Sequence, residues 1–143
     1  MCSSDLTGLE AAKNRWVLLV DNDVVLPPET LRVLLAAAGE GVALVQPRSV
    51  LYGDPETVHY DGGSPHCQGL ISLYNFYRPL AEAVGEGARD VDCVISLALL
   101  VDTDALAAVG GLATAYFILF HVLPPPLPPR PTPRPPPAPA AVS

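Results

Sequence analysis

The chain has 143 residues and half of them are apolar, which suits one domain with a sizeable core and excludes a disordered composition. Its formal net charge of −7, with only 8 lysines and arginines, argues against nucleic acid as a partner, and it means that phosphate groups would need a bridging cation. The 3 cysteines form an odd set without metal-ligand spacing, so a reducing compartment is expected rather than a disulfide framework.

The first third of the chain predicts a strand, a helix and a second strand. Residues 6–14 are expected to form the end of a helix, and the start of the chain has no apolar signal core. The run Trp16 to Val20 is continuously apolar and β-prone, which is typical of a strand covered on both faces. Asp21, Asn22 and Asp23 then close this strand.

A helix is expected after Pro27 and Pro28, because proline is tolerated in the first turn and Glu29 suits its positive end. Apolar residues then recur at helical spacing until Gly39 and Gly41, namely Leu31, Leu34, Leu35 and Ala38. Val42 to Val45 predicts a second short strand that Pro47 stops. Strand, helix and strand together indicate a βαβ unit with a parallel, right-handed crossover, and therefore an α/β sheet.

The middle of the chain is less regular. Thr57 to Tyr60 predicts a short strand between two turn signals, and Leu70 to Tyr77 fits either a strand or a helix. Gly85 to Asp90 is expected to be a loop, and Val91 to Val101 is another strongly apolar run. Asp102 or Thr103 can cap a short helix over residues 104–109, which Gly110 and Gly111 would end.

The composition changes abruptly near the end of the chain. Eleven of the 17 prolines lie between Pro124 and Pro139, so we expect a domain over residues 1–123 and a disordered or polyproline II tail over 124–143. Within the tail, Arg130 to Pro136 fits the R-x-x-P-x-x-P pattern that SH3-type grooves recognise. No apolar stretch reaches the roughly 18–20 residues of a membrane span. LATAYFILFHVL, residues 112–123, fits a buried strand or an interfacial segment.

Asp21 and Asp23 carry the strongest chemical signal. One interpretation is that they only solvate a turn and cap the next helix. The other is a metal site, because residues i and i+2 of an extended chain point the same way. Hard carboxylate ligands suit Mg²⁺ or Mn²⁺, which leave positions open for substrate phosphates. Open α/β sheets also bind ligands beyond the carboxyl ends of their strands, where this pair lies.

These residues resemble a known family. WVLLVDNDVVLPPETL, residues 16–31, is similar to the D-x-D segment of family 2 glycosyltransferases with the GT-A fold. The resemblance continues through ALVQPRSVLYGDPETVHYDGG and VDCVISLALLVDTDALAAVGGLATAYF. It covers roughly residues 8–120 in order and spacing.

The resemblance implies an α/β fold, a partial GT-A sheet (nucleotide-diphospho-sugar transferase-like) with flanking helices. It implies a nucleotide-sugar donor, a saccharide or lipid-linked acceptor, and Mg²⁺ or Mn²⁺ at Asp21 and Asp23. The cation would act as a Lewis acid on the departing diphosphate, and a separate carboxylate would deprotonate the acceptor hydroxyl. The expected location is cytoplasmic, without a transmembrane span, with peripheral contact at the inner face of the membrane as the alternative.

The chain also departs from the family pattern. It begins too late to contain the whole earlier unit that holds the nucleotide base. Leu112, Ala113 and Thr114 replace the usual aromatic-acidic pair, and no Asp or Glu follows Asp104, so no catalytic base is assigned. We therefore expect that the chain alone is inactive, and a shifted reading frame near codon 120 would explain the proline-rich end.

Several other residues are weaker candidates. Asp61, followed by Gly62 and Gly63, is expected to contact the donor, because glycine lets a ligand approach the backbone; an ordinary turn is the alternative. Other candidates, each with a structural alternative, are His121 as a surrogate base, His59, His66 and Cys67 as loop contacts, Asp92 at the site, and Tyr74, Phe76 and Tyr77 as sugar-stacking rings. Two other functions remain open: a non-catalytic α/β module with a proline-rich interaction tail, and a nucleotidyl-type transferase that uses the same acid pair.

Overall fold

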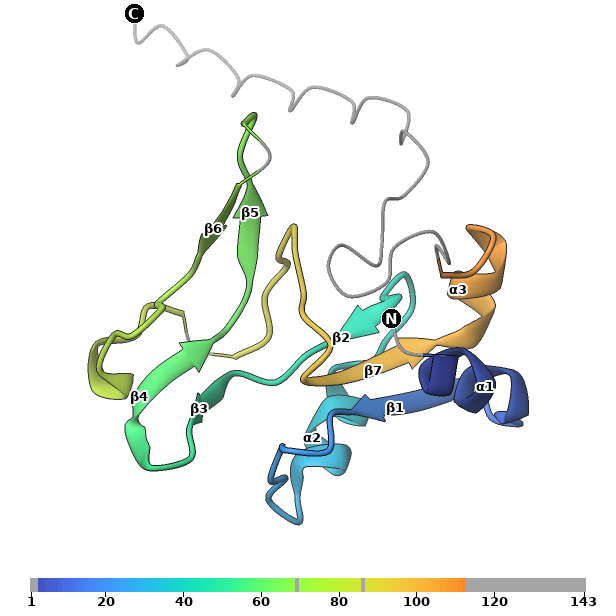
Figure 1. Cartoon of the computed structure of the whole chain (residues 1–143), viewed down its shortest axis with the longest axis horizontal. Helices are drawn as coiled ribbons and strands as arrows, with labels where there is room; N and C mark the ends of the chain where they lie inside the picture. Colours follow the sequence, from blue (N-terminus) through green and yellow to red (C-terminus); the bar gives the residue numbers. More distant parts are fainter. Residues whose placement is uncertain (1–2, 69, 86, 113–143) are drawn as a thin grey trace, which may run out of the picture.

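The computed structural model describes residues 3–68, 70–85 and 87–112. The expectations for the proline-rich tail, the boundary at 123 and His121 lie outside the described residues. Figure 1 shows two parts side by side, a three-stranded sheet with helices and a set of short hairpins. We call them the sheet lobe (residues 3–45 and 98–112) and the hairpin lobe (residues 49–82).

The sheet lobe is built on β1 (Trp16–Val20), β7 (Ala98–Asp102) and β2 (Leu44–Val45), in the order β1-β7-β2. β7 pairs antiparallel with both neighbours, with Leu18 opposite Leu100 and Leu44 opposite Val101. β1 and β2 therefore run in the same direction, as a βαβ unit requires, but β7 lies between them. The expected strand–helix–strand order is confirmed, and the central strand comes from residues far along the chain.

The core lies on β7, where all five residues are buried. The expectation that residues 16–20 form a strand covered on both faces is wrong, because β1 is half-buried and its last residue, Val20, is 42% exposed. The physical reason is position: β7 has a strand on each side, whereas β1 is the edge of this sheet within the described residues. The fully covered strand is the second apolar run, not the first.

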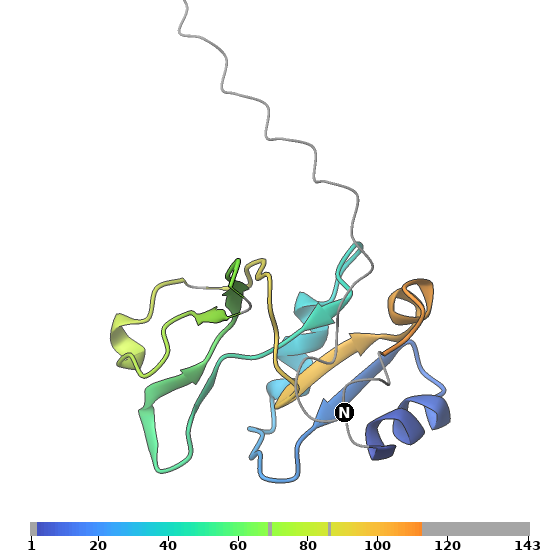
Figure 2. The same ribbon diagram turned by 45° about the horizontal axis from the view of Figure 1, so that its top comes forward.

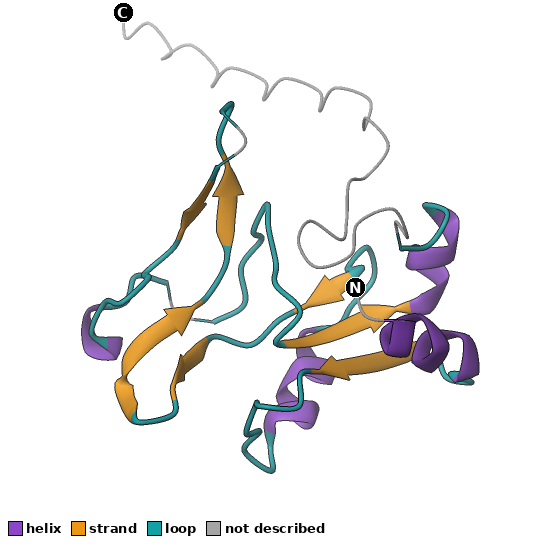
Figure 3. Cartoon of the chain, in the orientation of Figure 1, coloured by secondary structure: helices purple, strands orange, loops and turns teal. Residues whose placement is uncertain are grey.

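Among the described residues, three α-helices accompany the sheet; Figure 3 draws helices in purple. α1 (Ser3–Ala11) precedes β1, and α2 (Thr30–Ala37) follows the two prolines and buries Leu34. α3 (Thr103–Ala108) follows β7 directly; the Asp102 carboxylate caps it by accepting the N–H groups of Asp104 and Ala105, as expected. In the part of the chain that the structure describes, no helix is long and apolar enough to cross a membrane.

The hairpin lobe consists of short antiparallel pairs. β3 (Ser49–Leu51) pairs with β4 (Asp54–Tyr60), β5 (Gly63–Pro65) pairs with β6 (Ile71–Leu73), and a 3₁₀ turn η1 spans Leu80–Glu82. Val58 and Tyr60 of β4 supply its buried hydrophobic side chains among the described residues. Figure 2 shows this lobe beside the sheet lobe, connected through the segment before β3 and the segment before β7. Residues 70–77, for which strand or helix was open, form β6 and a turn.

Candidate functional site

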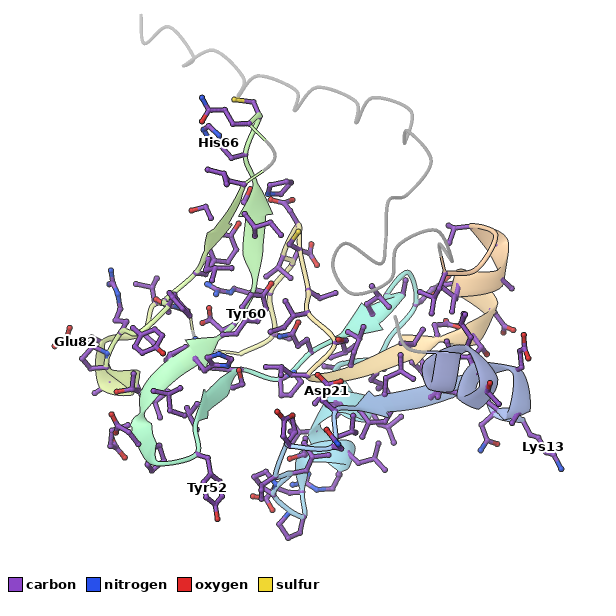
Figure 4. All side chains as sticks on the ribbon, viewed as in Figure 1. Lys13, Asp21, Tyr52, Tyr60, His66 and Glu82 are labelled. Atoms are coloured by element: carbon purple, nitrogen blue, oxygen red, sulfur yellow. The ribbon has the colours of Figure 1, made fainter. Side chains whose placement is uncertain are left out.

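Asp21 and Asp23 lie directly after β1, at the end of the strand that faces the hairpin lobe (Figure 4). Both residues are exposed. The Asp21 N–H donates to the Leu97 carbonyl at 3.0 Å, and its carbonyl accepts the Val24 N–H at 3.2 Å. The acids therefore sit on a short hydrogen-bonded turn that is tied to the entrance of β7.

This turn corrects one premise of the sequence analysis. The side chains of Asp21 and Asp23 were expected to point the same way because residues i and i+2 do so in an extended chain. Asn22 and Asp23 instead lie in a turn. The pair still lies within one short loop, and both residues are exposed. Within the described residues, no group of three or more His, Cys, Asp or Glu side chains is placed to hold a metal by itself. A cation here would need further ligands from substrate or water.

A cavity of about 1120 Å³ lies between β2 and the hairpin lobe. Its walls come from residues 42–46, from Arg48, from Asp61 and Gly62, and from the segment 80–94. Asp92 lines it too, while its carboxylate accepts the Ser64 hydroxyl at 3.0 Å. Of the acids that the sequence singles out, Asp61 and Asp92 thus line this cavity, whereas Asp21 and Asp23 are not among its described lining residues.

Asp61 is the most tightly held acid of the cavity. Its side chain is 4% exposed, and one oxygen, Oδ2, accepts two hydrogen bonds, from Arg48 Nε at 3.0 Å and from Asn75 Nδ2 at 2.7 Å. Arg89 forms an ion pair with the same oxygen at 3.2 Å and donates its hydrogen bond to the Asp61 backbone carbonyl at 3.3 Å. A buried carboxylate is tolerated when it is paired and hydrogen-bonded in this way. Its other oxygen, Oδ1, is shielded from solvent and has no hydrogen-bond partner within the described part of the chain.

The same cluster holds the loop that follows η1. Arg48 donates to the Gly85 carbonyl at 2.9 Å, and the Asn75 side chain both donates to and accepts from the backbone of Val84. Asn75 has a φ of 49°, in the left-handed region that asparagine tolerates better than most residues. Arg89 lies over the Tyr74 ring at 5.2 Å. One wall of the cavity is therefore fixed by polar contacts rather than by apolar packing.

Tyr60 lies beneath this cluster and donates its hydroxyl to the Cys93 carbonyl at 3.1 Å. Burial, followed by the nearby Cys93 thiol and the Asp61 carboxylate, raises the pKa of Tyr60 to about 12. Burial also raises the pKa of the Cys93 thiol. Both groups therefore remain protonated near neutral pH, and neither is an activated nucleophile.

A second polar cluster lies at the opposite end of the sheet lobe. Arg15 donates to the Asp102 carboxylate at 2.8 Å, and the Asp102 side chain is 4% exposed. The hydrogen bond from Arg15 and the backbone donors of α3 hold the pKa of Asp102 below its ordinary value, against the effect of burial. This pair connects the segment before β1 to the first turn of α3, and its role is structural.

The remaining candidates do not converge on one place. His66 and Cys67 are exposed near the tip of the β5–β6 hairpin, where Figure 4 shows His66 far from Asp21. His59 lies against Phe76 at 6.3 Å. Phe76 and Tyr77 are 48% and 61% exposed and meet edge to face at 4.6 Å, so they are not core residues.

Sequence reasoning missed the partners of Asp61. Arg48, Asn75 and Arg89 are separated from it by 13, 14 and 28 residues, so no local spacing connects them. It also missed Gln46, whose Oε1 accepts the Ile95 N–H at 2.8 Å and whose buried Nε2 has no partner in the structure. The sequence offered one indirect signal. The chain has only 8 lysines and arginines, so each is a candidate partner for a buried acid, and two of them pair with Asp61.

Comparison with known proteins identifies the family. The family model described as "Glycosyl transferase family 2" matches residues 5–93, more than half of the chain. Neither the comparison with curated proteins nor the comparison with solved structures found a significant match. The matched range contains β1, the acid turn, α2, β2 and the hairpin lobe, in the order that the resemblance implies. The α/β fold, a partial GT-A domain, agrees with this match, and the chain belongs to glycosyl transferase family 2.

Proposed function

We propose that this domain binds a nucleotide-diphosphate sugar for transfer to a hydroxyl of a saccharide or lipid-linked acceptor, with a divalent cation held at Asp21 and Asp23. The observation that carries the proposal is the position of this acid turn. It is exposed, it follows a strand of the sheet, and it lies within the residues that match a glycosyltransferase family. Ligands of open α/β sheets bind at such strand ends.

The donor set fits Mg²⁺ or Mn²⁺. Both cations prefer hard oxygen ligands and are commonly held by one or two carboxylates, with phosphate oxygens and water completing the shell. Two exposed carboxylates on one short turn supply this kind of incomplete protein shell. When bound, the cation would offset the negative charge of the departing diphosphate. This chain needs such a cation, because its net charge of −7 repels a diphosphate.

The chain's own residues hold the acid turn in place. The hydrogen bond from Asp21 to Leu97 connects the turn to the segment that enters β7, and β1 pairs with β7 over its full length. A metal-binding turn that is tied to the central strand keeps its carboxylates in position before the donor arrives. Such pre-organisation reduces the entropy cost of binding.

The direct test is donor binding, because no carboxylate follows Asp104 to act as the expected base. Calorimetric titration of the full chain with UDP, GDP and ADP, with and without Mn²⁺, should show metal-dependent binding of at least one nucleotide. Asp23→Ala should abolish the metal-dependent part. Glu56→Ala, which removes an exposed acid on β4, is the matched control and should bind like the unchanged chain. Nucleotide affinity that responds neither to Mn²⁺ nor to Asp23→Ala would contradict the proposal.

A further inference from the structure

Two residues that line the cavity between β2 and the hairpin lobe each have a shielded polar atom with no hydrogen-bond partner among the described residues. Asp61 Oδ1 is one of them, whereas Oδ2 of the same carboxylate accepts two hydrogen bonds and forms an ion pair with Arg89. Gln46 Nε2 is the second such atom. Its orientation is fixed, because Oε1 of the same amide accepts the Ile95 N–H. A shielded polar atom without a partner is unfavourable, so a ligand that satisfies both atoms would be favoured.

The two atoms make complementary demands. Asp61 Oδ1 requires a hydrogen-bond donor, whereas the Gln46 amide requires an acceptor. A hydroxyl group is both, and a sugar ring carries several hydroxyl groups on a rigid frame. A phosphate or a carboxylate would satisfy Gln46 but would be repelled by Asp61.

The charge of the cavity also favours a neutral ligand. Two arginines line it, Arg48 and Arg89, against three aspartates, Asp61, Asp90 and Asp92. Both arginines are already bound to Asp61. The lining therefore has no surplus of positive charge for a diphosphate, which separates this cavity from a donor-phosphate site. Its volume of about 1120 Å³ is slightly larger than that of ordinary ligand pockets, which span about 300–1,000 Å³.

We infer that this cavity is the subsite for the acceptor saccharide, with Asp61 accepting from and Gln46 donating to its hydroxyl groups; the assignment to an acceptor rests on the proposed function. Since both atoms are shielded, the ligand must displace a side chain to reach them. Arg89 is the candidate to move, because it is 34% exposed and reaches Asp61 from the loop that contains Gly85 and Gly87.

The test is a titration of the isotope-labelled full chain followed by NMR, without nucleotide or metal. The probes are neutral sugars that differ in hydroxyl orientation: the methyl α-glycosides of glucose, galactose and mannose, at millimolar concentrations. At least one should shift the Gln46 side-chain NH₂ resonances and the Gly62 amide in a saturable way. No saturable shift with any of them would overturn the inference, as would shifts that map to Phe76 and Tyr77 instead.

Gln46→Glu is the variant of choice, because it keeps an acceptor oxygen for the Ile95 N–H while it removes the donor. It should weaken glycoside binding about tenfold or more, as expected for the loss of a hydrogen bond from a buried group, with an unchanged spectrum elsewhere. Asp61→Asn gives a second measurement, but it leaves two arginines without their charge partner and risks unfolding. Unchanged glycoside affinity in Gln46→Glu would contradict the assignment.

Asp23→Ala separates this inference from the proposed function. In this variant, nucleotide binding should be lost while the glycoside still shifts Gln46 and Gly62. A glycoside that binds only as part of a nucleotide sugar would mark the cavity as a donor subsite and overturn the acceptor assignment. Loss of nucleotide binding without any effect on the glycoside supports two separate subsites.

Discussion

At the scale of single residues, two buried aspartates illustrate two uses of an Arg–Asp pair. Asp102 has all its interactions satisfied: Arg15 binds one oxygen and the first N–H groups of α3 bind the other. In Asp61, Oδ2 accepts two hydrogen bonds and forms an ion pair with Arg89, whereas Oδ1 has no partner among the described residues. The first arrangement is what a structural connection needs, and the second leaves capacity for a ligand.

The Arg15–Asp102 pair should make stability depend on pH. Because the folded-state pKa of Asp102 is lowered, its contribution is fully present above the unfolded-state pKa of about 3.9 and is lost as pH falls through the folded-state value. Asp102→Asn should therefore lower the thermal midpoint at neutral pH. Its difference from the unchanged chain should shrink as the solution is acidified below the unfolded-state pKa, as measured by circular dichroism.

Asp104→Asn is the matched control for this pair. Asp104 is also in the first turn of α3 and lies 3.9 Å from Arg15, but its side chain is 81% exposed. Solvent screening makes such a contact weak, so this variant should unfold close to the unchanged chain. Equal destabilisation by the two substitutions at neutral pH would show that burial of Asp102 is not what matters.

Residue-level prediction from the sequence succeeded where the signal was local. Asp102 as a helix cap was expected from its place before a short helix, and the structure confirms it. The turn that contains Asp61 was also expected, together with its two glycines, but its donors lie on three separate segments. Tertiary folding brings them together, and no pattern along the chain records that.

At the scale of elements, β7 determines the sheet. It contributes a buried residue at every position and pairs with both other strands. The sequence marked residues 91–101 as apolar but gave no means to tell that only 98–102 form a strand and that it is central. Residues 91–97 instead line the cavity or lead into β7. Strand order is a property of long-range pairing, which hydrophobic periodicity does not encode.

Leu100→Ala tests the central role of β7. Leu100 is 1% exposed, so the substitution should leave a cavity and reduce the free energy of unfolding by about 2–5 kcal/mol in urea titrations. Leu35→Ala on α2 is the control, because Leu35 is 43% exposed and should cost less than about 1 kcal/mol. If both substitutions cost the same, β7 would not be the core of the domain.

At the scale of the whole molecule, the acid turn and the cavity differ in exposure and in charge. In the proposed function, the exposed acid turn after β1 needs a cation to bind a diphosphate, whereas the cavity has both arginines and aspartates in its lining. The sequence predicted the acid pair, the α/β class and the family. It could not predict the second subsite, because that subsite forms only where the segment after β2, the residues before β5 and those before β7 come together.

The central claim is that Asp21 and Asp23 hold a divalent cation together with a nucleotide diphosphate, and paramagnetic broadening by Mn²⁺ tests it most directly. In NMR spectra of the full chain with UDP, substoichiometric Mn²⁺ should broaden the amides of residues 21–24 first, and Mg²⁺ in excess should restore them. Asp21→Asn combined with Asp23→Asn should remove this selective effect, with the fold unchanged. Broadening that centres on other acids, or that persists in the double variant, would contradict the account.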